Sequence, residues 1–554
     1  MKDRRRIADV PRRDADPARR LGGDAKPRRL RSGDVTSQAL PRAVGSEIPD
    51  AEEPTADPRR LGLWAALVGL FAVAASAAGS WIPSLWGDEA ASLMSATRPL
   101  PSLIHMLSYV DAVHGLYYLG LHAWIDVFGP SAFSIRFPSA LAVGVCAAAV
   151  VWLCGRFGTL RFAVVAGVFA AVLPRLIFAG EEARSYAMTA ALAAVLIAIL
   201  VEIGRRDSRA VGGWIAYAAV LTVGIWLFLY VALMVPAALV IVLLSPALRR
   251  RWRAWMFSTG IALVLCTPLA WFGFLQRRQI AFLAVRESVT AEVVLKNMWF
   301  QEWWFTAIAW ALILVAVIAF ARELIQMRRA GAGRWRTPGI RLEVVALSWM
   351  TVPMGLLLAV TPFVAVYTAR YGSFSAPAVA IVMALGVRRL ARLPRRRLGA
   401  RLAAVSIAVV VIAAVPVAAL QRGPYSKNQS DWNDIAAFIS TNAAPGDGIV
   451  FDDGARPSQR TRLAKATDPT AFRNVTDLLL RTQFQKSCTW YDQTYGIPRA
   501  AGMGRFDGVE RVWVVELKFD GVEDTWGLGQ LRSLGYHETR RVDGAGSVIL
   551  LYER

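Results

Sequence analysis

The chain has 554 residues, 55% of them hydrophobic, and it carries a formal net charge of +22. Its apolar residues form runs of about 17–22 residues with almost no charge, the length of a helix that crosses a ~30 Å hydrocarbon layer. This pattern excludes an ordinary soluble protein and predicts a multi-pass membrane protein. Arginine clusters lie between the apolar runs, as in cytoplasmic loops, so the basic charge does not indicate a nucleic-acid partner.

The N-terminal residues 1–60 are rich in Arg, Asp, Pro and Gly and have no apolar face. Such a composition cannot offset the entropy cost of ordering, so it predicts a disordered cytoplasmic tail. The first apolar run, about 62–82, follows a charged stretch that is too long for a cleaved signal peptide. We therefore expect a retained signal anchor, which starts a transmembrane domain at 61–420.

Ten further apolar runs follow the first. The basic loops between them should all be cytoplasmic, which requires the spans to alternate strictly. The segment Leu116–Phe128 is short and contains His122 and Asp126, so we interpret it as a juxtamembrane helix. The result is an α-helical membrane protein with about eleven transmembrane helices, a first outer loop at 83–114 and an outer C-terminal segment. The ten runs are 136–154, 160–179, 186–203, 212–229, 231–247, 255–274, 304–321, 343–361, 375–388 and 402–420.

Residues 421–554 differ from the apolar part and predict a small extracytoplasmic α/β domain. Asp431 precedes an amphipathic pattern that ends near Ile439, which is typical of a capped helix. Apolar and β-branched residues predict strands and one more short helix. The strands are expected at 448–451, 511–517 and 547–552, and the helix at 528–534.

The first outer loop contains two adjacent carboxylates, Asp88 and Glu89. Carboxylates are costly next to a low-dielectric layer, and one of this pair could accept a proton from a hydroxyl group. The alternative is a solvated helix-capping pair at the membrane surface. Residues Ser102–Tyr109 predict a helix in the interface plane, which either holds the loop over a site or merely anchors it.

Two later outer segments contribute arginines. Arg184 follows Glu181 and Glu182 at the start of a span, where its guanidinium could bind a phosphate bidentately. The alternative is an ion pair between Arg184 and one of these glutamates. Arg370 is a lone charge among apolar residues, and a charge in such a setting should pair with another group, for example an anionic ligand.

Five patterns follow one another along the chain, and together they resemble a known family. They are Trp86–Tyr118; Leu116-Tyr117-Tyr118 with His122, Trp124 and Phe128-Gly129; Arg136-Phe137-Pro138-Ser139-Ala140; Glu182-Ala183-Arg184-Ser185-Tyr186; and Ala369-Arg370-Tyr371 with Pro377. They resemble the GT-C superfamily of glycosyltransferases, in particular the protein O-mannosyltransferase and aminoarabinose-transferase branch, and its actinobacterial members. Many relatives have a Pro-Pro pair where this chain has His114-Gly115. The donor pocket is therefore expected to differ, with a histidine whose reference pKa is about 6.5.

The resemblance implies that a sugar is transferred from a polyprenyl-phosphate donor to a hydroxyl group. Mannose is the sugar that we expect first. The acceptor would be a protein, a glycolipid or another glycan on the outer face of the cell membrane, and the reaction would invert the anomeric centre. Asp88 would be the general base with Glu89 as its helper, and Arg184 and Arg370 would stabilise the leaving phosphate. Further substrate-binding residues are expected at Glu182, Tyr186, His114, Tyr117 and Tyr371.

No His, Asp or Cys spacing predicts a metal site, so a divalent cation such as Mg²⁺ or Mn²⁺ would bind only through the carboxylates. The main alternative is a multi-pass lipid or glycolipid transporter or flippase, because transporters also use intramembrane charges. The sequence contains no internal repeat of the kind that many transporters show. A non-catalytic assembly protein is the third possibility, and the outer C-terminal domain alone supports it.

Overall fold

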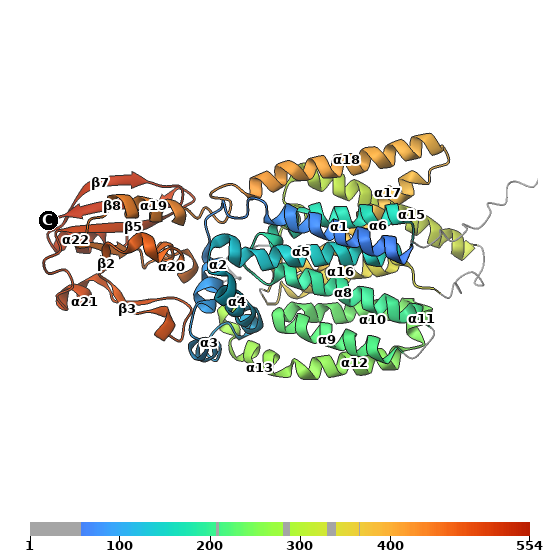
Figure 1. Ribbon diagram of the computed structural model, residues 1–554, viewed down its shortest axis with the longest axis horizontal. Helices are drawn as coiled ribbons and strands as arrows, with labels where there is room; N and C mark the ends of the chain where they lie inside the picture. The colour runs from blue at the N-terminus through green and yellow to red at the C-terminus, as the bar shows by residue number, and fades with distance from the viewer. Residues whose placement is uncertain (1–56, 207–209, 281–288, 330–338, 365) are drawn as a thin grey trace, which may run out of the picture. The chain divides into compact units, whose positions relative to one another are not determined.

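The computed structural model describes residues 57–206, 210–280, 289–329, 339–364 and 366–554. Most of the predicted N-terminal tail, 1–60, lies outside these ranges. Helices form the chain as far as Gln421, and a mixed sheet with short helices forms the remainder (Figure 1). A helical membrane protein with a C-terminal α/β domain, as predicted from the sequence, is the fold observed.

Seven of the predicted spans lie on helices that are long and apolar enough to cross a membrane. Such helices bury backbone polar groups in their own hydrogen bonds, which a hydrocarbon layer requires. The seven are α1 (Pro58–Ala77), α5 (Ala132–Gly155), α8 (Tyr186–Arg205), α15 (Trp303–Arg329), α16 (Leu342–Val360), α17 (Ala376–Ala391, extended by η6 at Ala369–Ser375) and α18 (Arg396–Gln421).

Two more predicted spans are helix pairs that bend at a break. The first pair meets at 59° and the second at 46°. Pro174 begins the second half of the first pair, and its missing N–H cannot continue the hydrogen bonds of the preceding helix. The pairs are α6 (Leu160–Val172) with α7 (Pro174–Gly180), and α12 (Trp252–Leu265) with α13 (Thr267–Leu275).

The last two predicted spans fall on shorter apolar helices, Val211–Leu227 and Leu229–Leu244. The first is α9, and the second consists of η2 (Leu229–Leu233) and α10 (Met234–Leu244). All eleven predicted runs therefore lie on helices, while the number that cross the membrane stays a prediction. Short connecting helices are α11 (Pro246–Arg249), η3 (Arg277–Ile280) and η4 (Val293–Asn297).

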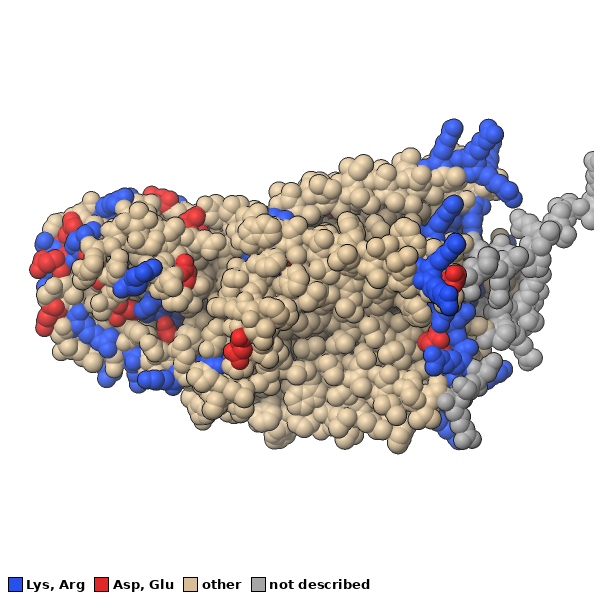
Figure 2. Space-filling view, viewed as in Figure 1, with Lys and Arg blue, Asp and Glu red and all other residues tan. Residues whose placement is uncertain are grey.

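Lysine and arginine gather at one end of the helical part in the view of Figure 2, and its middle shows an almost uncharged surface. Several helices have basic residues at the corresponding ends, including α8, α15 and α17. This distribution supports the predicted assignment of the arginine-rich loops to the cytoplasmic side. The orientation itself stays a prediction.

The predicted outer loop 83–114 is mostly helical. It contains α2 (Gly87–Ala96), α3 (Leu100–Leu107) and η1 (Ala112–His114), and α4 (Gly115–Phe128) follows at the predicted juxtamembrane helix. In α3, Leu103 and Met106 are buried, whereas Ile104 is exposed. Two apolar side chains of α3 thus pack inside the protein, and Ile104 stays on its outer surface, as a helix in the interface plane allows.

The C-terminal part contains a sheet with the strand order β2-β1-β5-β8-β7, and β6 pairs with β5. β1 is parallel to β2 and β5, and the other pairs of this sheet are antiparallel. The strands are β1 (Asp447–Phe451), β2 (Val475–Asp477), β5 (Arg511–Phe519), β6 (Val522–Glu523), β7 (His537–Asp543) and β8 (Ser547–Glu553), with a separate pair β3 (Leu480–Thr482) and β4 (Gln493–Thr494). The helices are α19 (Trp432–Asn442), α20 (Leu463–Thr467), α21 (Ile497–Gly502) and α22 (Leu528–Ser533).

The predicted helix and strands of this domain are confirmed, but the predicted cap is not. The Asp431 carboxylate makes no hydrogen bond to the first turn of α19. Its Oδ2 instead accepts hydrogen bonds from the Gly546 backbone N–H and the Ser547 hydroxyl, at 2.8 and 2.9 Å. Asp431 therefore ties α19 to the start of β8, a role that a local sequence pattern does not contain.

The C-terminal domain contacts the helices that follow α1. Arg98 Nη1 donates a hydrogen bond of 2.9 Å to the Ser487 carbonyl oxygen, and Ser102 donates one to the Gln485 carbonyl oxygen. A Cβ atom on Gly87 would lie only 2.0 Å from the Ser458 carbonyl oxygen. The N-terminus of α2 is therefore packed directly against the C-terminal domain.

Candidate functional site

Asp88 lies in the first turn of α2, where a carboxylate is favoured by the partial positive charge of the helix N-terminus. Its Oδ2 is 2.8 Å from Arg370 Nη2 and 3.9 Å from Arg184 Nη2. These three side chains are 10–15% exposed. Residues almost 300 positions apart in sequence thus form one largely buried charge cluster, and Asp88 joins both predicted phosphate-binding arginines.

Arg184 also belongs to a hydrogen-bond chain. Its Nη1 donates to the Tyr118 hydroxyl at 3.1 Å, and that hydroxyl donates to Asp111 Oδ2 at 3.1 Å. Burial raises the pKa of Asp111, and Arg184 acts in the opposite direction. Tyr118 and Asp111 were part of the sequence patterns without an assigned role, and the structure places them behind Arg184.

Glu89 points away from this cluster and is fully buried against Arg136. Arg136 Nε lies 2.7 Å from Glu89 Oε1, and Nη2 contacts Oε2, so the pair is bidentate. Glu89 Oε1 also accepts a hydrogen bond of 2.9 Å from the Ala183 backbone N–H. Glu89 therefore joins α2, α5 and the segment before Arg184. These buried contacts suit a residue that positions its neighbours and does not itself contact a substrate.

Glu182 is also fully buried, and within the described residues neither of its carboxylate oxygens has a hydrogen-bond partner. Burial raises its pKa, against the opposing effects of Lys427 and Arg370. Burial likewise raises the pKa of the neighbouring Glu181 to about 7. Lys427 lies with Nζ 3.9 Å from the centre of the Phe178 ring, and no sequence pattern pointed to it.

The predicted alternative of an ion pair between Arg184 and its neighbouring glutamates does not occur in the described structure. Glu181 Oε2 is 3.6 Å from Arg422 Nη1, and Arg184 is next to Asp88. The backbone explains the difference, because Ser139 holds the carbonyl oxygens of Glu182 and Arg184 at 2.7 and 3.2 Å. Arg184 is therefore directed toward α2.

Aromatic residues form one side of the cluster. The Tyr186 and Tyr371 rings lie 6.1 Å apart, and Phe228 contacts both, at 5.6 and 5.2 Å between ring centres. His114 lies parallel to Phe228 at 6.4 Å. Burial lowers the pKa of His114 to about 3, and the nearby Arg184 acts in the same direction, which favours the neutral form of this ring.

Tyr117 and Arg370, two residues of the predicted site, have further features that bear on substrate binding. Tyr117 is buried, and within the described residues its hydroxyl has no hydrogen-bond partner. The Arg370 guanidinium lies 4.9 Å from the centre of the Trp86 ring, which is a cation–π distance. The structure thus brings together Asp88, Arg184 and Arg370, with the predicted tyrosines and His114 along their aromatic side.

This arrangement suits anion binding and proton transfer. Two guanidinium groups lie next to the same Asp88 oxygen. Their two positive charges exceed the single negative charge of Asp88, so the cluster can bind an anionic ligand. A carboxylate beside such a ligand can accept a proton from a hydroxyl group. Asp88 and Glu89 are each paired with arginine. This pairing does not favour the Mg²⁺ or Mn²⁺ site that the sequence analysis allowed at these carboxylates.

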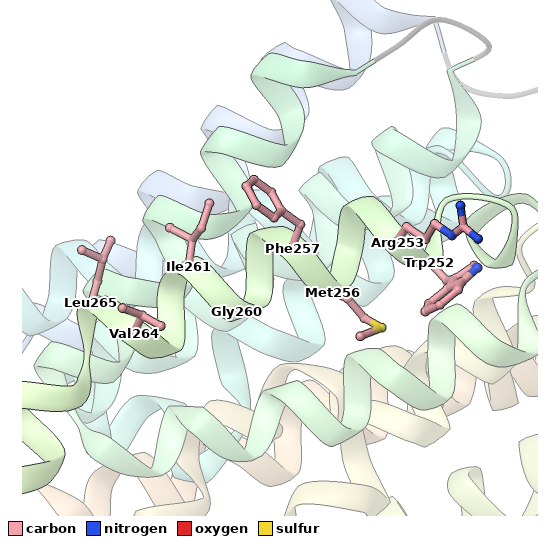
Figure 3. Close-up of a pocket in the computed structure, with 8 residues that line it drawn as sticks. All are labelled: Trp252, Arg253, Met256, Phe257, Gly260, Ile261, Val264 and Leu265. Carbon is pink, nitrogen blue, oxygen red and sulfur yellow. The ribbon is translucent and has the colours of Figure 1, made fainter.

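A large apolar groove lies elsewhere, with a volume of about 620 Å³ (Figure 3). All of its lining residues belong to α12, and they include Phe257, Ile261 and Leu265. None of the predicted site residues lines it. A groove of this composition along one exposed helix suits contact with lipid chains and not the chemistry of the charge cluster.

Residues 116–272 match the protein family described as dolichyl-phosphate-mannose-protein mannosyltransferase. In three dimensions the chain is similar to ArnT from Cupriavidus metallidurans in the apo state, with a TM-score of 0.51 and 13% identity over 88% of this chain and 97% of that one. At 13% identity, this likeness shows that the two proteins share a fold. A second structure of the same ArnT, bound to undecaprenyl phosphate, matches this chain with the same TM-score and identity over 98% of its length. No curated protein matches the chain in sequence.

The family match covers only part of the candidate site. Tyr117, Glu182, Arg184 and Tyr186 lie within the matched residues, but Asp88 lies outside them. The matched segment and the fold therefore agree with the resemblance found in the sequence. The position of Asp88 beside Arg184 comes from the geometry of this chain.

Proposed function

We propose that this protein is a glycosyltransferase of the GT-C superfamily, and that it transfers a sugar from a polyprenyl-phosphate donor to a hydroxyl acceptor on the outer face of the cell membrane. Mannose is the sugar we propose first, in agreement with the description of the matched family. The supporting observation is the Asp88 carboxylate held between Arg184 and Arg370. One site then contains both a proton acceptor and cationic groups for a lipid phosphate.

In the proposed reaction, the acceptor oxygen bonds to the anomeric carbon while the bond from that carbon to the phosphate oxygen breaks. The proton of the acceptor hydroxyl passes to Asp88, and the electron pair of the broken bond leaves with the lipid phosphate. Arg184 and Arg370 stabilise the charge that develops on this phosphate. Attack opposite to the leaving group inverts the anomeric centre.

Such an in-line displacement requires the base and the leaving phosphate on opposite faces of the sugar. The direct contact between Asp88 and Arg370, at 2.8 Å, leaves no room for a sugar between them. We therefore propose that donor binding replaces this contact with one between Arg370 and the phosphate. The Trp86 ring and the tyrosines then provide flat, partly apolar surfaces beside the sugar.

The experiment is to supply membranes that contain the protein with a panel of polyprenyl-phosphate sugars, and to measure transferred sugar and released polyprenyl phosphate. Wild-type membranes are expected to consume a donor, with polyprenyl-phosphate mannose tested first. Asp88→Asn keeps the size of the side chain but removes the base, and it should lower the rate by about 100-fold or more. The matched control is Asp126→Asn, since the Asp126 side chain is 67% exposed on α4 and lies outside the cluster.

Full activity of the Asp88→Asn variant would show that Asp88 is not the base. A protein in liposomes that moves lipid across the bilayer but releases no polyprenyl phosphate with any donor would favour the transporter. These outcomes separate the role of one residue from the class of reaction.

A further inference from the structure

Three carboxylates lie close together where strand β1 ends beside β5 in the C-terminal sheet. None of them takes part in the proposed transfer reaction. Asp452 directly follows β1, Glu516 lies in the adjacent parallel strand β5, and Asp524 follows β6. One carboxylate oxygen of each residue lies within 4.8 Å of the corresponding oxygens of the other two. The sheet topology therefore collects acidic groups from three separate segments.

The backbone holds two of these carboxylates in place. Asp452 Oδ1 accepts a hydrogen bond of 2.7 Å from the Gly454 N–H, and Asp524 Oδ1 accepts one of 2.8 Å from the Thr525 N–H. A Cβ atom on Gly454 would lie 3.1 Å from Asp524 Oδ2 and 3.3 Å from Asp452 Oδ1. The glycine thus allows the backbone to approach both carboxylates closely.

Glu516 has no such support. It is fully buried, and within the described residues neither of its oxygens makes a hydrogen bond, although the Trp526 backbone amide lies nearby. In the part of the chain that the structure describes, no lysine or arginine forms an ion pair with any of the three acids. Burial, together with Asp452 and Asp524, raises the pKa of Glu516 to about 9.

A buried carboxyl group without a donor destabilises a fold unless a proton or a cation compensates it. We propose that Asp452, Glu516 and Asp524 form a binding site for a divalent cation that prefers oxygen ligands, and that this cation is Ca²⁺. The ion would join the end of β1 to β5 and to the segment after β6. This proposal does not depend on the transfer activity.

The coordination chemistry of the two ions favours Ca²⁺ over Mg²⁺ for three carboxylates that come from separate segments. Two ligands of one Ca²⁺ ion, bound at 2.3–2.6 Å, lie at most about 5 Å apart, whereas two ligands of Mg²⁺ lie at most about 4.2 Å apart. The oxygens of the three acids lie within 4.8 Å of one another, which is inside the first limit. Ca²⁺ also accepts irregular geometry and additional backbone carbonyl or water ligands.

The experiment uses the purified full-length protein in detergent, with Tb³⁺ as a luminescent probe for the calcium site. Trp526 can sensitise this probe, because its Cδ1 lies 3.0 Å from where a Gly454 Cβ atom would be. We expect saturable terbium luminescence on excitation of tryptophan, displaced by Ca²⁺ at lower concentrations than by Mg²⁺. CaCl₂ alone should raise the Tm by about 5 °C or more at saturation.

Glu516→Gln should abolish the sensitised luminescence and the calcium-dependent rise in Tm. Without calcium its Tm should equal or exceed that of the wild type, because a neutral amide replaces a buried acid. Asp524→Asn, at a partly exposed position, provides a second variant should Glu516→Gln fail to fold. Glu538→Gln, on the exposed strand β7, is the matched control and should respond to calcium as the wild type does.

Two results would overturn the proposal. If the wild type shows neither a luminescence signal that depends on Glu516 nor a calcium-dependent Tm, the three acids share protons and bind no ion. If Mg²⁺ displaces terbium as well as Ca²⁺ does, the assignment to calcium is wrong.

Discussion

Asp88 and Glu89 are neighbours in sequence, yet their surroundings give them different roles. The Asp88 side chain is 15% exposed and is paired with Arg370, whereas the Glu89 and Arg136 side chains are not exposed at all. In α2 successive side chains point about 100° apart, so one of the pair faces the cluster and the other faces α5. Of the two carboxylates, only Asp88 contacts Arg370 and Arg184.

Glu89→Gln should destabilise the fold, because it leaves the Arg136 charge buried without a counter-ion. The expected cost is about 3–5 kcal/mol, which thermal unfolding in detergent would detect as a large fall in Tm. Glu202→Gln is the matched control, since Glu202 and Arg156 are 25% and 24% exposed and such a pair contributes at most about 1 kcal/mol. Equal shifts in Tm for the two variants would contradict the positioning role of Glu89.

At the scale of helices, close approach of backbones determines where the site residues lie. A Cβ atom on Gly69 of α1 would lie 2.9 Å from the Gly144 carbonyl oxygen of α5. Small residues at such contacts let helices in a membrane pack tightly without a hydrophobic driving force. Because α5 also contributes Arg136 and Ser139, this packing places the groups that orient Glu89 and Arg184.

A second close contact provides a test of this packing. A Cβ atom on Gly386 of α17 would lie 2.2 Å from the Leu312 carbonyl oxygen of α15. Gly386→Ala should force these helices apart and lower the stability by about 1–3 kcal/mol, measured as a fall in Tm. Gly355→Ala in α16 is the control, because no atom lies within 4 Å of its Cβ position and alanine favours a helix by up to about 1 kcal/mol. A Tm for Gly386→Ala at or above that of Gly355→Ala would refute the argument.

At the scale of the whole molecule, the predicted topology puts the C-terminal domain and the Asp88 cluster on the same side of the membrane. The contact between Gly87 and Ser458 agrees with this arrangement, since it joins α2 to the C-terminal domain. The arginine-rich ends of α8, α15 and α17 would then face the cytoplasm.

Cysteine labelling tests this orientation. Cys488 is half-buried in the C-terminal domain, whereas the other three cysteines are buried in the helical part. A membrane-impermeant maleimide should therefore label intact cells at Cys488, and Cys488→Ser should remove the label. Arg395→Cys, in the Cys488→Ser background, should react only after permeabilisation. Labelling with the opposite sidedness would reverse the topology.

Much of this protein could be predicted from local sequence patterns. Runs of apolar residues determine helices in a membrane, because every backbone polar group must be paired within its own helix. Short runs of apolar and β-branched residues likewise predicted β1, β5 and β8. Strand β7 was missed because its side chains are charged or exposed and carry no apolar alternation. The residues of the cluster could also be predicted, since Asp88, Arg184 and Arg370 are charges in apolar surroundings.

The partners of these charges were decided only by the tertiary structure. Arg184 had two adjacent glutamates as local partners, but Ser139 and Glu89 hold its backbone segment so that it meets Asp88. Lys427 and the Asp452 cluster belong to segments with no recognisable motif. Sequence spacing determines which helices form, because helical hydrogen bonds are local, whereas the strands find their partners across long distances in sequence, as β1 does with β5. The pairing of buried charges depends on long-range packing, because electrostatic partners in a low-dielectric interior are selected by distance in space.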